Sequence, residues 1–128
     1  MPNYRKEPIM LNIICLAGFA VLIAVGQLLF KKAGLIMRDQ PLLDGVAAVA
    51  SSPSLYFALI LYGVATAIWI WILSRVPLSL AYPWIGVGVI LVPLLAAYVY
   101  GERMNTMYWI GAALVAFGVV LTQWGTTS

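Results

Sequence analysis

The charged residues of this chain divide the sequence into four long uncharged stretches, and this spacing limits the folds open to it. Seven Lys or Arg and four Asp or Glu residues fall within positions 5–7, 31–32, 38–44, 75 and 102–103. The stretches 8–30, 45–74, 76–101 and 104–128 carry no charge. A bilayer core of about 30 Å is crossed by about 20 apolar residues of helix, so each stretch holds one span and none holds two. The sequence therefore predicts four transmembrane helices.

The composition excludes a soluble domain. Of the 128 residues, 64% are hydrophobic and 9% are charged, whereas about a quarter of the residues in a soluble domain are charged. The chain has no His and a single Cys, Cys15, which excludes a His/Cys zinc site and an internal disulfide. The side chains of the sequence provide no nucleophile–base pair for catalysis, and the seven cations are too scattered to form a nucleic-acid-binding patch. We therefore expect a membrane protein that is not an enzyme and uses no metal or cofactor.

We place the four helices at about 9–33, 54–73, 77–100 and 106–124, in one domain that covers residues 1–128. Gly34 provides a natural C-terminal stop for the first helix, and Pro93 predicts a break in the third. The segment 35–53 is predicted to be a connector with a short interfacial helix. Because lipid offers no hydrogen bonds to open strand edges, the fold class is an all-α membrane protein.

The cations divide almost equally between the two predicted membrane faces. One face collects three cations and the other collects four: Arg5, Lys6 and Arg75 against Lys31, Lys32, Arg38 and Arg103. A difference of one cation does not fix the orientation by the positive-inside rule. Two alternatives are compatible with this count. Either all copies insert in one orientation, or copies insert in both orientations and pair antiparallel.

The first helix carries a polar face close to one membrane edge. Gln27 and Lys31 lie one helical turn apart on this face. An amide and an ammonium group in this position suit an anionic head group such as a phosphate. The alternative for Lys31 and Lys32 is that both side chains extend to the interface as stop signals. No helix has Asp or Glu in its middle, so none offers a carboxylate to carry a proton across the membrane.

The third helix contains a stretch in which Pro83 is followed by Gly86 and Gly88. A proline removes a backbone donor, and glycines weaken the helix after it. We expect a hinge at these residues that bends between two states or lets another helix cross closely.

Aromatic and polar side chains on the third helix and just after it predict a pathway for an amphipathic ligand. The substrate-binding candidates on this segment are Tyr82, Trp84, Tyr98, Glu102 and Arg103. We expect Tyr82 to converge with Gln27 and Lys31 around a lipid phosphate. The alternatives are an interfacial aromatic belt and a local pair between Glu102 and Arg103.

The fourth helix carries Gly111 and Gly118, seven residues apart, with alanines between them. Small residues on one face let helices approach closely in lipid, so this face is a candidate dimer interface. Four short helices enclose too little space for a substrate pathway in one copy, which also favours a dimer. The alternative is that these glycines pack within a single subunit.

Several of these segments resemble one family. They are VPLSLAYP at 76–83, GVG at 86–88, GE at 101–102, WIG at 109–111, GVV at 118–120 and GQLLFKK at 26–32. Their order and spacing are similar to the drug/metabolite transporter superfamily, and more narrowly to its four-helix branch of small multidrug resistance proteins and their relatives. The resemblance implies a small four-helix bundle that works as a homodimer or as a heterodimer with a similar small subunit.

The resemblance also implies a function. Multidrug exporters of this branch carry a membrane-embedded Glu in the first helix, and its place falls near Ile23 here. Gln27 and the segment AYP at 81–83 look more like the subunits that flip undecaprenyl-phosphate-linked aminoarabinose, although the segment GVG at 86–88 is closer to the exporters. The implied protein is an inner-membrane flippase for a polyprenyl-phosphate-linked sugar. A proton-coupled exporter of small cations and a non-transporting partner subunit are the alternatives.

Overall fold

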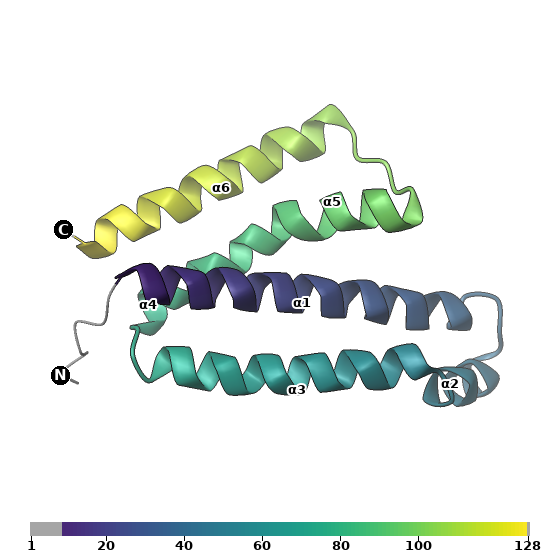
Figure 1. Ribbon diagram of the computed structural model, residues 1–128. Coiled ribbons are helices and arrows are strands. Elements are labelled where there is room, and N and C mark those ends of the chain that lie inside the picture. Colours follow the sequence, from purple (N-terminus) through teal and green to yellow (C-terminus); the bar gives the residue numbers. More distant parts are fainter. Residues whose placement is uncertain (1–8, 128) are drawn as a thin grey trace.

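The structure, a computed structural model, describes residues 9–127, which form helices joined by short loops. Arg5 and Lys6 of the charge count lie outside this range. The described elements are α1 (Ile9–Met37), α2 (Leu42–Ala50), α3 (Pro53–Leu73), α4 (Leu78–Ala81), the 3-10 helix η1 (Tyr82–Val87), α5 (Gly88–Tyr100) and α6 (Thr106–Thr127) (Figure 1). Within residues 9–127 there is no strand.

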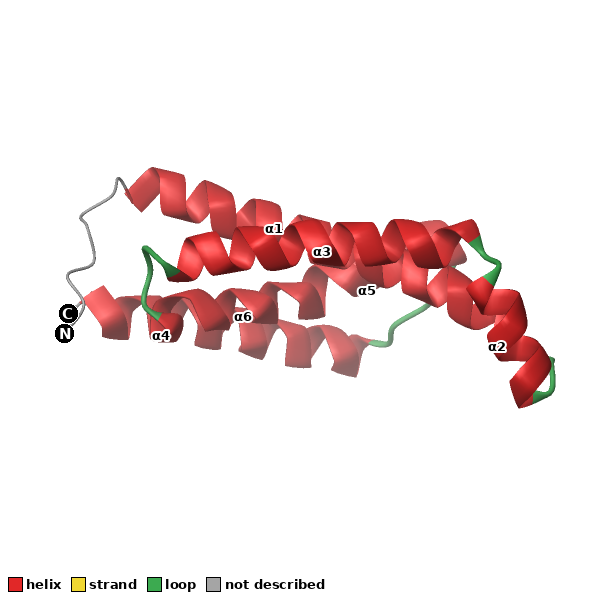
Figure 2. Cartoon of the chain, turned by 90° about the horizontal axis from the view of Figure 1, so that it is seen from below, coloured by secondary structure: helices red, strands yellow, loops and turns green. Residues whose placement is uncertain are grey.

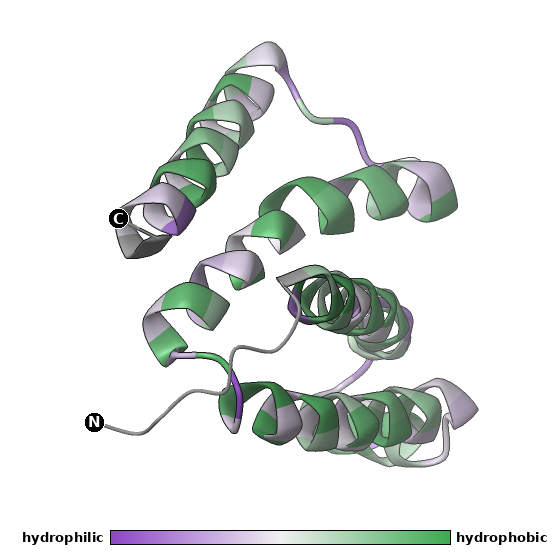
Figure 3. Cartoon of the chain, turned by 60° about the vertical axis from the view of Figure 1, so that its left-hand side comes forward, coloured by the Kyte–Doolittle hydropathy of each residue, from purple (hydrophilic) through white to green (hydrophobic). Residues whose placement is uncertain are grey.

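Four segments of the chain are long and apolar enough to cross a membrane. They are Met10–Met37, Pro53–Leu73, Leu78–Tyr100 and Thr106–Gly125. The third of these spans consists of α4, η1 and α5 in succession. Figure 3 shows hydrophobic colour along these helices and hydrophilic colour in the loop between α5 and α6. The predicted all-α membrane fold with four spans is therefore confirmed.

The first helix is longer than predicted, because it runs past Gly34 to Met37. A glycine ends a helix when it adopts the left-handed conformation, and in the described chain only Gly101 has a positive φ among the glycines. The residues after Gly34 are the apolar Leu35, Ile36 and Met37, which extend the span. The predicted stop at Gly34 is wrong for this reason.

The connector contains the short helix that the sequence predicts, α2, which projects from the end of the bundle (Figure 2). Its Gly45 is buried against Met37 of α1. Leu42, Leu43 and Val46 are exposed. An apolar surface at the end of a membrane bundle is typical of a helix that lies in the lipid interface.

Pro83 changes the type of helix, whereas Pro93 does not interrupt it. The chain passes from α4 into the 3-10 helix η1 at Tyr82, and η1 includes Pro83. By contrast, α5 continues through Pro93, so the predicted second break is wrong. Pro93 has no N–H for the carbonyl of Val89, four residues earlier. The hydroxyl of Tyr108 on α6 donates to that carbonyl instead, which satisfies the group inside the membrane.

A second side chain of α6 donates to a backbone carbonyl near Pro83. The amide of Gln123 donates to the carbonyl of Leu80 over 3.1 Å. Leu80 belongs to α4, three residues before Pro83. Both hydrogen bonds attach α6 to backbone carbonyls of the third span, and the one at Val89 satisfies a carbonyl that Pro93 leaves without its usual partner.

Helix α1 lies between α3 and α5, while α6 lies on the far side of the third span (Figure 1). Small residues are buried on both α1 and α3, among them Ala20 and Ala24 on α1 and Ala58 and Ala65 on α3. Close backbone approach through small residues is the usual packing mode of helices in lipid. The core cluster gathers towards the N-terminal end of α1: Leu16, Phe19, Ala65, Ile72, Val76 and Ala81.

Candidate functional site

One turn of α1, residues 27–31, carries polar contacts to both neighbouring helices. The side-chain amide of Gln27 donates to the hydroxyl oxygen of Tyr62 on α3. The hydroxyl of Tyr100, the last residue of α5, donates to the carbonyl of Leu28 over 2.7 Å. Lys31 then forms an ion pair with Glu102, just beyond α5. These contacts place the predicted polar face of the first helix where three segments of the chain meet.

The ion pair between Lys31 and Glu102 lies at the end of the bundle. Lys31 Nζ is 3.1 Å from Glu102 Oε1, and the two side chains are 49% and 42% exposed. Gly101 ends α5 in the left-handed conformation, with φ 68°, and its N–H donates to the carbonyl of Ala97 over 3.1 Å. This glycine cap turns the chain so that Glu102 meets Lys31 instead of the adjacent Arg103. The sequence allowed a local pair between Glu102 and Arg103, but in the structure Glu102 pairs with Lys31.

Tyr62 belongs to this site, although the sequence did not mark it. Its ring packs directly on Gly26, where an added Cβ would lie 2.5 Å from Tyr62 Cε2. The ring also lies 5.0 Å from the ring of Phe30. The available signal was a phenol in the middle of an apolar span, away from the interfaces where aromatic belts form. Gly26 thus provides the space in which Tyr62 receives the hydrogen bond from Gln27.

A cavity of about 250 Å³ continues from this pair into the bundle. It lies between α1, α3 and the third span, and its lining residues are Phe19, Ala20, Ile23, Ala24, Gln27, Tyr62, Ile85, Gly88 and Val92. Only the Gln27 amide and the Tyr62 hydroxyl bring polar side-chain groups to this lining. Ile23, near the place where the resemblance implies the Glu of multidrug exporters, is part of the apolar wall. The cavity therefore offers neutral hydrogen-bonding groups and no charge.

The structure does not bring Tyr82 to this site. Tyr82 begins η1 and is 61% exposed, whereas Glu102, the partner of Lys31, follows the end of the same span. Their separation along the span is about 30 Å at 1.5 Å per residue. The expected convergence of Tyr82 with Gln27 and Lys31 is wrong, because the two ends of one span lie at opposite membrane faces.

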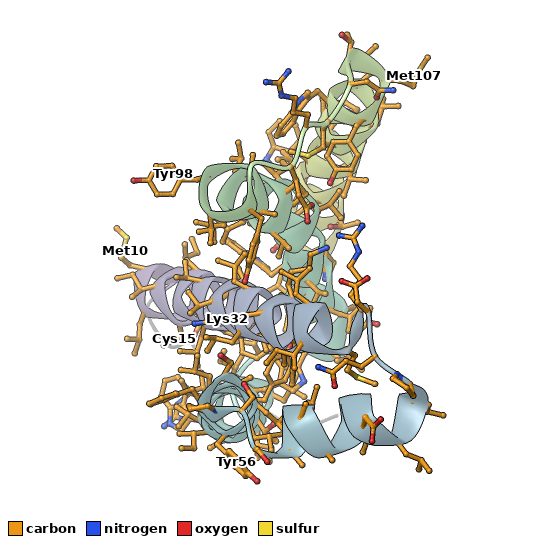
Figure 4. The ribbon with its side chains drawn as sticks, turned by 90° about the vertical axis from the view of Figure 1, so that its right-hand side faces the viewer. Met10, Cys15, Lys32, Tyr56, Tyr98 and Met107 are labelled. Carbon is orange, nitrogen blue, oxygen red and sulfur yellow. The ribbon has the colours of Figure 1, made fainter. Side chains whose placement is uncertain are left out.

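The other predicted ligand-binding residues are scattered. Tyr98 is 90% exposed and extends away from the helices (Figure 4). Trp84 is half-buried, packs against the core cluster and lines a groove beside α6. Arg103 is exposed in the loop after Glu102. The substrate-binding roles of these three residues stay predictions.

The glycines of the predicted hinge differ in their surroundings. An added Cβ at Gly86 would lie 3.0 Å from Val119 Cγ2 and 3.4 Å from Val115 Cγ1, so Gly86 permits a close approach of α6. Gly88 lines the cavity, and its added Cβ would come no closer than 4.0 Å to a side chain. Close helix crossing is thus found at Gly86, and bending at Pro83, Gly86 and Gly88 stays a prediction.

Gly111 and Gly118 do not pack within the chain. An added Cβ would meet no atom within 4 Å at either position. Large apolar side chains stand exposed along the same helix: Met107, Ile110, Leu114, Phe117, Leu121 and Trp124. Figure 4 shows Met107 extending outward at the start of this face. The structure therefore shows no contact that supports packing of these glycines inside one subunit. The dimer interface stays a prediction.

The fold and this site define a class of protein. Residues 9–127 form four spans, with a small cavity between three of them and an ion pair at one end of the bundle. No group of His, Cys, Asp and Glu among these residues is arranged to hold a metal. This is a small multi-pass membrane protein of the transporter type.

The chain belongs to the EamA-like transporter family, whose sequence profile matches residues 7–124. This finding confirms the resemblance to drug/metabolite transporters. A protein of Pectobacterium atrosepticum named "Probable 4-amino-4-deoxy-L-arabinose-phosphoundecaprenol flippase subunit ArnE" is 33% identical over 115 residues, which cover 90% of this chain and 96% of that protein. Proteins of the same name from Yersinia pestis and Yersinia pseudotuberculosis are each 36% identical over 70 residues, or 55% of this chain and 61% of theirs. No solved structure matches the chain.

Proposed function

We propose that this chain is a subunit of a flippase in the bacterial inner membrane. It moves a polyprenyl-phosphate-linked sugar across the bilayer without changing it chemically. The relatives are named for such a lipid, in which a phosphate joins an undecaprenol chain to an amino sugar. The proposal extends that substrate class to this chain on the basis of its own polar site.

The observation that carries the proposal is the position of Lys31. Its ammonium lies half-exposed at the end of the bundle, where a lipid phosphate enters from the same leaflet. One turn deeper, Gln27 and Tyr62 offer neutral donors and acceptors that suit sugar hydroxyl groups. An ammonium at the membrane edge followed by uncharged polar groups matches a head group with a phosphate and a sugar.

Proton-coupled export of small cations receives less support from the same site. Such a mechanism needs a carboxylate in the membrane that binds a proton or a cation in turn. The cavity has Ile23 where that residue is expected, and none of the four spans contains Asp or Glu.

The flippase works as an assembly of two small subunits. Helix α6 leaves an apolar face without cover in one copy, beside Gly111 and Gly118. A second subunit, identical or similar, packs against this face and encloses a pathway that one copy is too small to provide. The word "subunit" in the names of the relatives agrees with such an assembly.

The test is lipid binding by variants of the two neighbouring lysines. A charge-assisted hydrogen bond contributes about 1.5–3 kcal/mol, so Lys31→Ala weakens binding of a polyprenyl phosphate about tenfold or more. Lys31→Arg retains much of the affinity, and Lys32→Ala changes it little. Binding of short-chain polyprenyl phosphate to purified protein in nanodiscs measures this. Equal losses at both lysines contradict a specific site and indicate general surface attraction.

A further inference from the structure

We infer that the ion pair between Lys31 and Glu102 selects lipids whose head group carries both a phosphate and an amine. The phosphate replaces Glu102 at Lys31, and the ammonium of the head group takes the place of Lys31 at Glu102. This inference rests on the proposed function and adds a selectivity element to it.

The Lys31–Glu102 ion pair can exchange partners at a low cost in free energy. Both side chains are close to half exposed, so water screens their attraction, and such a pair contributes little to stability. Opening it costs the protein little, provided that each charge finds a new partner. A zwitterionic head group supplies both partners at once, so no charge is left unpaired near the membrane edge.

Glu102 is held in place by the fold and not by a long loop. The Gly101 cap fixes its backbone through hydrogen bonds from the N–H groups of Gly101 and Glu102 to the carbonyls of Ala97 and Ala96, over 3.1 and 3.5 Å. The bond from Tyr100 to the Leu28 carbonyl attaches the same end of α5 to α1. The backbone of Glu102 therefore keeps its position when the ion pair opens, so the carboxylate remains within reach of the bound head group.

A purely anionic head group meets a different site. The phosphate of such a lipid pairs with the Lys31 ammonium. Glu102 then has no cation beside it and lies close to a second negative charge. Like charges at this distance disfavour binding. The carboxylate thus rejects the anionic lipid, and specificity comes from this repulsion as well as from the attraction of the amine.

The experiment compares a lipid whose amine is charged with one whose amine is acetylated. The probes are a short-chain polyprenyl phosphate linked to an amino sugar and its N-acetylated form, in which the amine no longer carries a charge. Binding is measured with the full chain in nanodiscs. The wild-type protein should prefer the free amine about tenfold, the value of one charge-assisted contact. In Glu102→Gln this preference disappears, because the N-acetylated lipid binds better and the free amine binds less well.

The controls separate this inference from the proposed function. Asp44→Asn removes another exposed carboxylate at the same end of the bundle, on α2, and should keep the preference. Wild-type protein that binds both lipids equally, or a Glu102→Gln variant that keeps the preference, overturns the selectivity while the flippase proposal stands. Wild-type protein that binds neither lipid overturns both. The comparison of lipids on the wild-type protein depends on no substitution, so it holds even where a variant folds poorly.

Discussion

Helices α1 and α6 are both apolar and both cross the membrane, but the molecule holds them in different ways. In the most apolar part of α1, 28% of the residues are buried within the chain, against 6% in α6. Helix α1 packs between two helices and carries every residue of the polar turn 27–31. Helix α6 contacts only the third span closely. The more buried helix carries the site, and the less covered helix carries the surface that we propose for a second subunit.

The largest expected effect comes from filling the space that α1 leaves for α3. In Gly26→Leu the new side chain collides with the ring of Tyr62. The ring is displaced, its hydrogen bond with Gln27 breaks, and unfolding becomes easier by about 1–3 kcal/mol, as for other overpacked cores. Thermal unfolding in detergent measures the loss. The matched control is Gly34→Leu on the same helix, where an added Cβ meets no atom within 4 Å. Equal effects at both glycines contradict the role of Gly26.

On α6 the corresponding glycine substitution should affect association and not folding. An added Cβ at Gly118 meets nothing in the single chain, so Gly118→Leu leaves its unfolding unchanged. We expect it to weaken dimerisation about tenfold, because it holds apart two helices that small residues let approach. Cross-linking at graded protein concentration measures the dimer fraction. Ala113→Leu, about 140° around the helix, is the control. An unchanged dimer fraction in Gly118→Leu places the interface elsewhere.

A smaller effect is expected where α6 is attached to the third span. Tyr108→Phe removes the donor to the Val89 carbonyl, which Pro93 cannot satisfy. The free energy of unfolding should fall by about 1 kcal/mol. In a Pro93→Ala background a backbone N–H is available again, and the same substitution should cost less. Detergent unfolding of the four proteins measures the coupling. An equal cost in both backgrounds means that the proline and the tyrosine act independently.

The smallest effect concerns the proton gradient. Neither α1 nor α6 contains Asp or Glu, and the other two spans have none either. Dissipating a pH gradient across reconstituted vesicles should therefore leave the rate of lipid flipping unchanged. A rate of lipid flipping that falls with the gradient contradicts the absence of proton coupling. Efflux of a quaternary cation that is driven by protons and lost with the gradient contradicts the flippase proposal.

Part of the site followed from local features of the sequence. Gln27 and Lys31 share a face of one helix by their spacing alone, and the structure places both in the polar turn. Pro83 changes the helix type where the sequence predicted an interruption. Both features depend on residues within one or two turns, for which helix geometry is sufficient.

The remaining contacts join residues far apart in the chain. Gln27 and Tyr62 are separated by 35 positions, and Leu28 and Tyr100 by 72. Which residues meet depends on how each helix is rotated about its axis. In a soluble protein an apolar stripe reveals this rotation, but these spans are apolar on all sides because lipid surrounds them. The expected position of Tyr82 was wrong for a different reason, because the division of the cations between the two faces already places the start of the third span, beside Arg75, opposite Lys31.

The sequence by itself determined the four spans, the absence of a carboxylate within them and the polar face of the first helix, because charge and spacing along one chain are sufficient for each. The tertiary structure decided that Glu102 is the partner of Lys31, that Tyr62 lies on Gly26, and that α6 donates hydrogen bonds to two backbone carbonyls of the third span. These pairs form through close packing of small residues and through backbone groups that need a partner in lipid. Such contacts arise only when the helices are in place.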